Sequence, residues 1–259
     1  MTISFGIQKG GSGKTTTSGI VASLLSADYK VLAVDMDGQG NLSQMLTGID
    51  DPYEFGGKTT MEAIKAEDAK PFIRKVTDTL DVLVSDELIT TLASHLYLTV
   101  HNKQKKETNF ALKAALSTVQ DDYDYIIIDT PPALGEQTYN ALTASDYVVV
   151  MFEPSKFCHS AILSFFETIE HIQDNLNPDL KVAGILRTLI DNRRADNSYY
   201  FELISEEYPE LLFGQVIQRT AAVARAPFFG LTKSNSELKQ VNNQYLGFVK
   251  ELINVVDQR

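Results

Sequence analysis

The apolar residues of this chain form short unbroken runs that alternate with longer segments of helical spacing. Unbroken apolar runs are typical of strands that are buried on both faces of a parallel sheet. We expect strands over 2–7, 30–35, 80–84, 123–129, 146–152, 181–189 and 215–219, and helices over 14–26, 42–46, 59–66, 86–98, 107–120, 158–175 and 239–256. This alternation predicts an α/β fold, a doubly wound and mostly parallel sheet flanked by helices, formed by residues 1–259 as a single domain.

The helix expected over 239–256 has an apolar stripe and a mixed opposite face. A helix that lies on a membrane carries a strongly basic face opposite its apolar one. Here Lys250 adjoins Glu251, and Asp257 follows. We therefore expect packing against the sheet by the stripe, which consists of Val241, Tyr245, Phe248, Val249, Leu252, Ile253 and Val256.

The composition is that of a soluble globular protein, with 44% hydrophobic and 22% charged residues. The sequence shows no apolar segment long enough to span a membrane and no signal peptide. Its one cysteine, Cys158, excludes an intrachain disulfide and is expected in the core. These features predict a cytoplasmic protein. The net charge of −11 argues against a surface that binds nucleic acid throughout, so any DNA contact must be local.

A glycine-rich segment follows the first expected strand and opens the first expected helix. Glycines allow backbone N–H groups to converge on an anion, and a helix N-terminus adds partial positive charge. One glycine of the usual phosphate-loop pattern is missing, because Gln8 stands in its place. The segment still predicts a phosphate-binding loop, which consists of Lys9, Gly10, Gly11, Ser12, Gly13, Lys14, Thr15 and Thr16.

Carboxylates follow two of the buried strands. Asp35 and Asp37 come at the end of one strand, and Asp129 ends another. In doubly wound sheets, ligands bind at the carboxyl ends of the strands. Together with the glycine loop, these acids predict a phosphate-loop nucleoside triphosphatase that uses Mg²⁺. We expect Lys14 to contact the terminal phosphates, Asp37 to position the attacking water, and the metal site to consist of Thr15, Asp35 and Asp129.

Three motifs make the chain similar to the ParA/MinD family of ATPases. Residues 9–16, KGGSGKTT, resemble the deviant Walker A motif of that family, with Lys9 in the place of its signature lysine. Residues 37–41, DGQGN, resemble the DPQGN of the ParA branch, except that Gly38 replaces the proline and is expected mainly to loosen the loop. Residues 129–135, DTPPALG, resemble its D-x-P-P-x-L-G.

The likeness continues through 141–146, 184–188 and the Ala-Pro element at 226–227, and so covers nearly the whole chain. It implies an ATP-dependent homodimer that encloses two ATP molecules, with Lys9 reaching the partner's phosphates and Pro227 at the nucleotide. Family members bind double-stranded DNA without sequence preference as ATP dimers. A ParB-type centromere-binding partner stimulates hydrolysis and releases them. The resemblance therefore implies plasmid or chromosome segregation, with nucleoid association in the ATP-bound state.

The DNA contacts that the resemblance implies fall on arginines late in the chain. The family's DNA-contacting arginine corresponds to Arg193, which has Arg194 beside it in a polar turn. A second family arginine falls on Ala222, which leaves Arg219 and Arg225 as further candidates. The chain begins at the first strand, so we do not expect the N-terminal helix-turn-helix extension of larger relatives.

Two other functions fit the same scaffold. A MinD-like membrane-cycling ATPase would need a basic amphipathic tail, whereas residues 254–259 read NVVDQR. A metabolic ATP-dependent ligase would respond to a metabolite rather than to DNA and a partner protein. A nitrogenase-type iron protein is excluded, because its cluster needs two cysteines from each subunit. A basic cluster at 101–106 is either a solvated loop or a minor DNA-facing patch.

Overall fold

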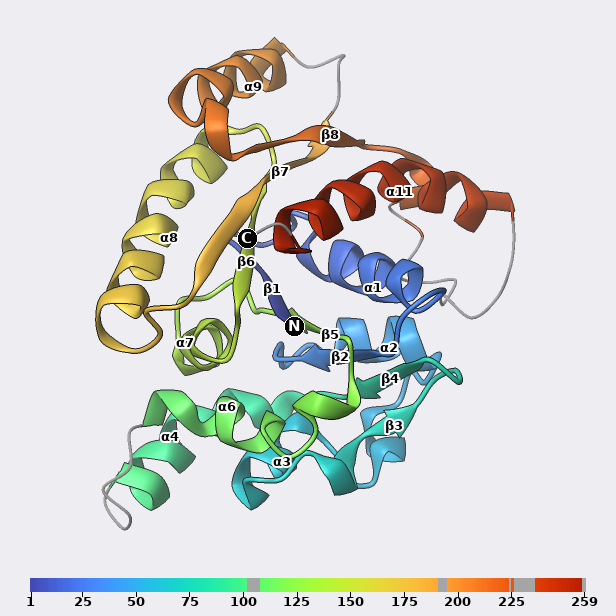
Figure 1. Cartoon of the computed structure of the whole chain (residues 1–259), viewed down its shortest axis with the longest axis vertical. Coiled ribbons are helices and arrows are strands. Elements are labelled where there is room, and N and C mark those ends of the chain that lie inside the picture. Colours follow the sequence, from blue (N-terminus) through green and yellow to red (C-terminus); the bar gives the residue numbers. More distant parts are fainter. Residues whose placement is uncertain (102–107, 191–194, 224, 226–235, 258–259) are drawn as a thin grey trace.

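The computed structural model describes residues 1–101, 108–190, 195–223, 225 and 236–257. Within these residues, an eight-stranded sheet has the order β3-β4-β2-β5-β1-β6-β7-β8 (Figure 1). Neighbouring strands are parallel, except for the antiparallel pair of β3 and β4. The strands are β1 (Thr2–Gly6), β2 (Val31–Asp35), β3 (Arg74–Lys75), β4 (Leu80–Leu83), β5 (Tyr125–Asp129), β6 (Tyr147–Phe152), β7 (Lys181–Ile190) and β8 (Leu212–Gln218).

Helices cover both faces of the sheet, which confirms the predicted fold class. In Figure 1, α1, α2 and α11 lie along one face, and α3, α4, α6, α7 and α8 lie along the other. Their bounds are α1 (Lys14–Leu25), α2 (Asn41–Thr47), α3 (Thr60–Ala66), α4 (Leu92–His95), α6 (Ala111–Leu116), α7 (Glu136–Thr143), α8 (Lys156–Asn175), α9 (Ala195–Glu207) and α11 (Ser236–Asp257).

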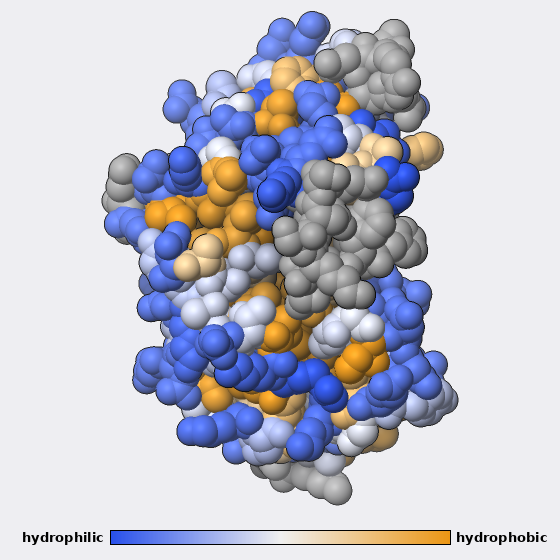
Figure 2. Space-filling view, turned by 90° about the vertical axis from the view of Figure 1, so that its right-hand side faces the viewer, coloured by the Kyte–Doolittle hydropathy of each residue, from blue (hydrophilic) through white to orange (hydrophobic). Residues whose placement is uncertain are grey.

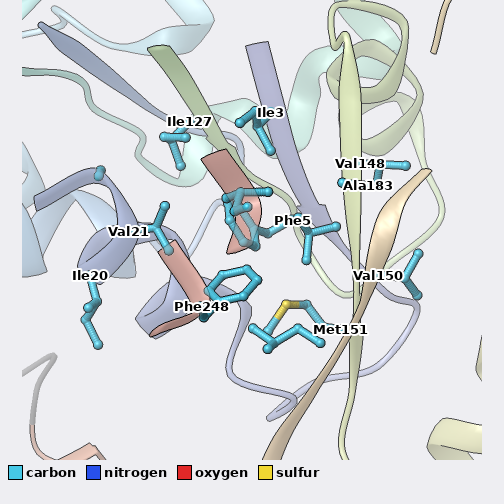
Figure 3. Packing of buried hydrophobic residues seen from close by; sticks show 14 of the residues in the cluster. Ile3, Phe5, Ile20, Val21, Ile127, Val148, Val150, Met151, Ala183 and Phe248 are labelled. Carbon is cyan, nitrogen blue, oxygen red and sulfur yellow. The ribbon is translucent and has the colours of Figure 1, made fainter. Parts of the chain in front are cut away.

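The central strands are buried on both faces because alternate side chains enter two different cores. Leu32 and Ile128 belong to the core that α3, α4, α6 and α7 cover. Figure 3 shows the other core, where Phe5 of β1 lies close to Phe248 of α11; the two rings meet edge to face with their centroids 6.5 Å apart. In the parallel pairing of β2 with β5, Asp35 lies opposite Asp129. The carboxylates predicted to act together therefore end two adjacent strands.

Helix α11 packs against the sheet as its stripe predicted. Val241, Phe248 and Leu252 are buried. The Tyr245 hydroxyl lies 3.1 Å from the hydroxyl of Thr17 on α1. The side of the molecule that faces the viewer in Figure 2 shows hydrophobic areas interrupted by hydrophilic residues. Among the described helices, none has the length and apolar character needed to cross a membrane.

The largest differences from the sequence prediction lie in the helices. The segment expected as one helix over 86–98 is a 3₁₀ turn, then α4, then a π-helical stretch over Leu96–His101. Within 108–120, the described part of the other expected helix, the short helix α6 lies between 3₁₀ turns. The predictions missed α7, which is only eight residues long, and α9, which has no strong apolar stripe of its own. Tertiary contacts, rather than local periodicity, stabilise these elements.

Candidate nucleotide site

The loop between β1 and α1 has the backbone shape that its glycines predict. Gly11 and Gly13 have φ values of 74° and 83°, in the left-handed region that residues with a Cβ rarely adopt. Gly13 is the N-cap of α1, and no side-chain hydrogen bond caps this helix in the described chain. The first N–H groups of α1 are therefore arranged as in a helix N-terminus that binds an anion.

This loop opens onto a cavity of about 330 Å³ at the carboxyl ends of the strands. Asp37, which comes from the segment after β2, lines the same cavity. The structure thus brings the predicted loop and the predicted water-positioning acid together. The complete lining is Gly10, Gly11, Ser12, Gly13, Lys14, Thr15, Thr16, Asp37, Gln39, Asn41 and Pro132.

The Lys14 side chain folds back over its own loop. Its Nζ donates to the carbonyl oxygen of Lys9 at 2.8 Å and to that of Ile7 at 3.3 Å. Burial lowers the pKa of Lys14, and the negative charges of Asp129 and Asp37 oppose that shift. Since its hydrogen-bond acceptors among the described residues are neutral carbonyl oxygens, this buried ammonium would gain from an anionic ligand, because phosphate oxygens offer charge-assisted hydrogen bonds.

Two fully buried carboxyl groups lie behind the cavity. The pKa of Asp129 is raised to about 8, first by burial and then by the negative charge of Asp35. Burial also raises the pKa of Asp35, to about 6, against hydrogen bonds from Ser43. Oδ1 of Asp129 accepts a hydrogen bond from Ser18, whereas its buried Oδ2 has no partner among the described residues. The Thr15 hydroxyl lowers the pKa of Asp129. The hydroxyl oxygen of Thr15 and the carboxyl oxygens of Asp129 are the kind of ligand that a hard divalent cation prefers.

Asp35 also shapes the segment that presents Asp37. Its Oδ1 accepts from the backbone N–H of Asp37 at 3.0 Å, and its Oδ2 accepts from the N–H and the hydroxyl of Ser43 at 2.9 and 2.7 Å. Asp37 in turn accepts from the N–H of Gln39 at 3.1 Å. These bonds hold the Asp37 carboxylate at the edge of the cavity.

Lys9 points away from this cavity and toward Glu153, the residue after β6. Lys9 Nζ and Glu153 Oε2 form an ion pair. The other oxygen of Glu153, Oε1, accepts from Arg219 Nη2 at 2.9 Å. Arg219, a predicted DNA contact, therefore has a carboxylate partner within its own chain, and its side chain is 45% exposed.

Comparison with known proteins identifies the family. A family described as "AAA domain" matches residues 1–182. The chromosome partitioning protein ParA of Myxococcus xanthus is 33% identical over 250 residues, which are 95% of this chain and 85% of that protein. The chain belongs to the ParA family of partition ATPases.

Solved structures agree with this ParA-family assignment. A putative plasmid partition protein from Borrelia burgdorferi, bound to AMPPNP, has a TM-score of 0.76 at 25% identity, over 96% of this chain and 98% of that one. A cobyrinic acid a,c-diamide synthase from Mycobacterium smegmatis, with bound ATP analog and magnesium, has a TM-score of 0.79 at 28% identity, over 96% of this chain and 92% of that one. One scaffold therefore carries both a partition protein and a metabolic enzyme.

The candidate DNA contacts of this ParA-family chain are only partly described. Arg193, Arg194 and the predicted nucleotide contact Pro227 lie outside the described residues, as does most of the basic cluster at 101–106. Arg225 is exposed. Ala222, where the second family arginine falls, is 5% exposed and belongs to the core. Ala222 therefore has a packing role in this chain.

Sequence reasoning missed two residues that touch the loop. Glu153 pairs with Lys9, and the Thr188 hydroxyl donates to the carbonyl oxygen of Ser12 at 2.8 Å. Both residues occur at the carboxyl end of a buried strand, where the ligand chemistry of an open α/β sheet gathers. For Glu153, the available signal was a polar residue directly after an apolar run, whereas Thr188 lies inside its strand after Arg187 and gave no such signal. Such a signal predicts the edge of the sheet on which a residue lies, but not which residue it contacts.

Proposed function

We propose that this chain is an ATP-dependent DNA partition ATPase. In this proposal, its ATP-bound homodimer binds double-stranded DNA without sequence preference, and hydrolysis stimulated by a ParB-type centromere-binding protein releases it. The observation that carries the proposal is the convergence of the glycine loop, Lys14 and Asp37 on one cavity. The ParA-family relatives support the biological role. The protein would act in the cytoplasm and associate with the nucleoid when it holds ATP.

ATP would bind with its phosphates in the loop. The N–H groups from Gly10 to Thr16 would stabilise charge on the bridging and terminal oxygens. Lys14 would exchange its two loop carbonyls for the terminal phosphates, and Pro227 would lie at the nucleotide. Asp37 would orient a water molecule in line with the γ-phosphate, a role that a carboxylate performs without acting as a strong base.

The carboxyl groups behind the cavity fit Mg²⁺. When bound, Mg²⁺ neutralises charge on the β- and γ-phosphates while the γ-phosphoryl group is transferred to water and ADP leaves. The Thr15 hydroxyl would hold it directly and the Asp129 carboxylate through a water. Asp35, whose oxygens already accept three hydrogen bonds from the protein, would act on the ion through its negative charge.

DNA binding follows from dimerisation in this proposal. Lys9 would reach the phosphates that the partner subunit holds, which makes the dimer depend on ATP. Arg193 and Arg194 would then contact DNA phosphates, with Arg219 and Arg225 as additional cations. Because such contacts are electrostatic, binding should be independent of sequence and should weaken as salt increases.

The direct test measures DNA binding with no nucleotide, with ADP, with ATP and with a non-hydrolysable analogue. We expect binding to unrelated duplexes only with ATP and the analogue, at equal affinity for each sequence. Equal binding in all four states would contradict the proposal. ATP turnover that responds to a small metabolite and not to DNA would instead indicate a metabolic ATP-dependent ligase.

Replacing Lys14 with alanine tests the nucleotide site itself. We expect Lys14→Ala to abolish ATP binding, because no other described ammonium lies within the cavity lining. Isothermal titration calorimetry with ATP measures the loss, and circular dichroism checks that the fold is kept. Lys65→Ala is the matched control, since that lysine pairs with Glu62 on α3, away from the loop. Retained affinity in Lys14→Ala would remove Lys14 from the phosphate site.

A further inference from the structure

Glu153 joins the phosphate loop to the end of β8 through its two carboxylate oxygens. Oε2 pairs with Lys9 and Oε1 with Arg219. We call these three residues the Glu153 cluster. The Glu153 side chain is 13% exposed and that of Lys9 is 22% exposed, so water screens their attraction only in part. The cluster ties Lys9 to its own subunit.

The two loop lysines are held differently. Lys14 rests on neutral carbonyl oxygens, whereas Lys9 rests on a carboxylate. A carboxylate is the stronger acceptor for an ammonium, because the hydrogen bond is charge-assisted. Nucleotide phosphates can therefore draw Lys14 from its resting place more easily than Lys9. Removal of Lys9 from Glu153 requires a competing group of comparable negative charge.

Arg219 lowers the free energy needed for that removal. A largely buried carboxylate that loses its only cation is strongly destabilising. The guanidinium of Arg219, 2.9 Å from Oε1, would keep Glu153 paired after Lys9 leaves. The Arg219 backbone is held in place because its N–H donates to the Ile190 carbonyl at 2.9 Å. The cluster can thus exist as two cations on one carboxylate, or as a single neutral pair.

We propose that Glu153 is a positioning residue for Lys9. In the nucleotide-free chain it holds Lys9 within its own subunit, and Lys9 exchanges Glu153 for the partner's nucleotide phosphates when the dimer forms. Arg219 keeps Glu153 paired during that exchange. This inference rests on the proposed function, because it assumes an ATP-dependent dimer. It adds a residue that sets how readily the dimer forms.

The exchange makes two substitutions in one cluster act in opposite directions. Glu153→Gln removes the carboxylate that competes for Lys9, so the ATP dimer should form more readily. Arg219→Gln leaves Glu153 dependent on Lys9, so Lys9 should be harder to remove and the dimer should weaken. If the cluster only stabilised the fold, both substitutions would shift dimerisation in the same direction. The sign of the two effects is therefore diagnostic.

The test measures the dimer dissociation constant by analytical ultracentrifugation with a non-hydrolysable ATP analogue and no DNA. We expect Glu153→Gln to lower this constant by about fivefold and Arg219→Gln to raise it by at least as much. Glu170→Gln is the matched control, since it removes an equal charge from an exposed position on α8. It should leave the constant unchanged.

A double-mutant cycle separates the exchange from simple repulsion between Glu153 and the nucleotides. In a Lys9→Met background, Glu153→Gln should have no effect, because the competing ammonium is gone. A fivefold effect in that background would overturn the proposal, and so would a Glu153→Gln chain that dimerises like the wild type. If Glu153→Gln does not fold, Arg219→Gln is compared in the wild-type and Lys9→Met backgrounds instead. Loss of its effect without Lys9 supports the exchange, and an effect that persists overturns it. A wild-type chain that stays monomeric with the analogue would overturn the proposed function as well.

Discussion

Gly38 has a packing role that the sequence did not indicate. As a replacement for proline it is expected to loosen its loop. In the structure, a Cβ on Gly38 would lie 2.6 Å from Cγ2 of Thr90. The Thr90 hydroxyl donates to the Glu87 carbonyl at 2.7 Å, which fixes the direction of its methyl group. Glycine at position 38 therefore allows a close contact between two segments.

This contact predicts that Gly38→Ala is destabilising. The added methyl group would overlap the Thr90 methyl, and we expect the free energy of unfolding to fall by about 1 kcal/mol. Denaturant unfolding measures it. Thr90→Ser removes the opposing methyl but keeps the hydroxyl, so the double variant should regain most of the loss, while Thr90→Ser alone changes little. A Gly38→Ala chain as stable as the wild type would contradict the packing explanation.

The buried carboxyl of Asp129 predicts a pH dependence of stability. Its pKa is about 8 in the folded chain, against an ordinary value of 3.8. Between these values the folded state keeps a proton that the unfolded state loses, so the free energy of unfolding should fall as pH rises through this window. Asp35, whose pKa is raised to about 6, adds to this fall in the free energy of unfolding at pH values between 3.8 and about 6.

Denaturant unfolding of the nucleotide-free and magnesium-free protein checks this slope. In Asp129→Asn the side chain no longer titrates, so stability should become nearly independent of pH above about pH 6, where the Asp35 contribution ends. Asp50→Asn, which alters an exposed acid, is the control and should keep the wild-type slope. Stability that rises with pH in the wild type would show that Asp129 is ionised in the fold.

At the scale of elements, β7 links the phosphate loop to the segment that carries the candidate DNA contacts. Thr188 donates to the Ser12 carbonyl of the loop. The next residue, Leu189, has a φ of 54°, an unusual value for a residue with a branched side chain. Its side chain lies about 3.9 Å from where a Cβ of Gly13 would be. Arg193 follows four residues after Leu189 in the sequence. The end of β7 is therefore shaped against the loop.

Thr188→Val should weaken nucleotide binding while the fold is kept. Valine matches threonine in shape but cannot donate to the Ser12 carbonyl, so the loop loses one buried hydrogen bond. We expect the dissociation constant for ATP to rise about fivefold, which corresponds to about 1 kcal/mol. Titration calorimetry measures it. Thr143→Val is the control, because the buried Thr143 hydroxyl has no partner among the described residues. Unchanged affinity in Thr188→Val would argue against this link.

At the scale of the whole molecule, charge and function must be reconciled. A net charge of −11 opposes general attraction to DNA. Arg219, which follows β8, is already paired with Glu153. The proposed DNA binding would therefore require a local cluster of cations, and a dimer would supply two such clusters. ATP-dependent dimerisation offers a physical reason why one subunit alone would bind DNA weakly.

Asp37→Ala should separate DNA binding from hydrolysis. The variant keeps the loop and Lys14, so we expect ATP-bound dimers that remain on DNA. Loss of the carboxylate that positions the water should reduce turnover by at least about a hundredfold. Phosphate release and retention on immobilised DNA measure the two effects, with Asp50→Ala as the exposed control. Undiminished turnover in Asp37→Ala would exclude Asp37 from positioning water.

Much of the fold was predictable because its signals are local. Unbroken apolar runs correspond to β2, β5 and β6, all of which are buried. The short helices were less predictable. Helix α7 and the helical turns around α4 form where the sheet and neighbouring helices cover them, and periodicity within these short segments carries little of that information.

The sequence by itself determined the chemistry of the phosphate loop, since glycine backbone freedom and a lysine before a helix act over a few residues. It also determined that Asp35, Asp37 and Asp129 would end their strands at one edge of the sheet. Only the tertiary structure decided that Lys9 meets Glu153, a residue 144 positions away. That contact depends on the strand order, in which β1 lies between β5 and β6, and strand order is set by packing across the whole sheet.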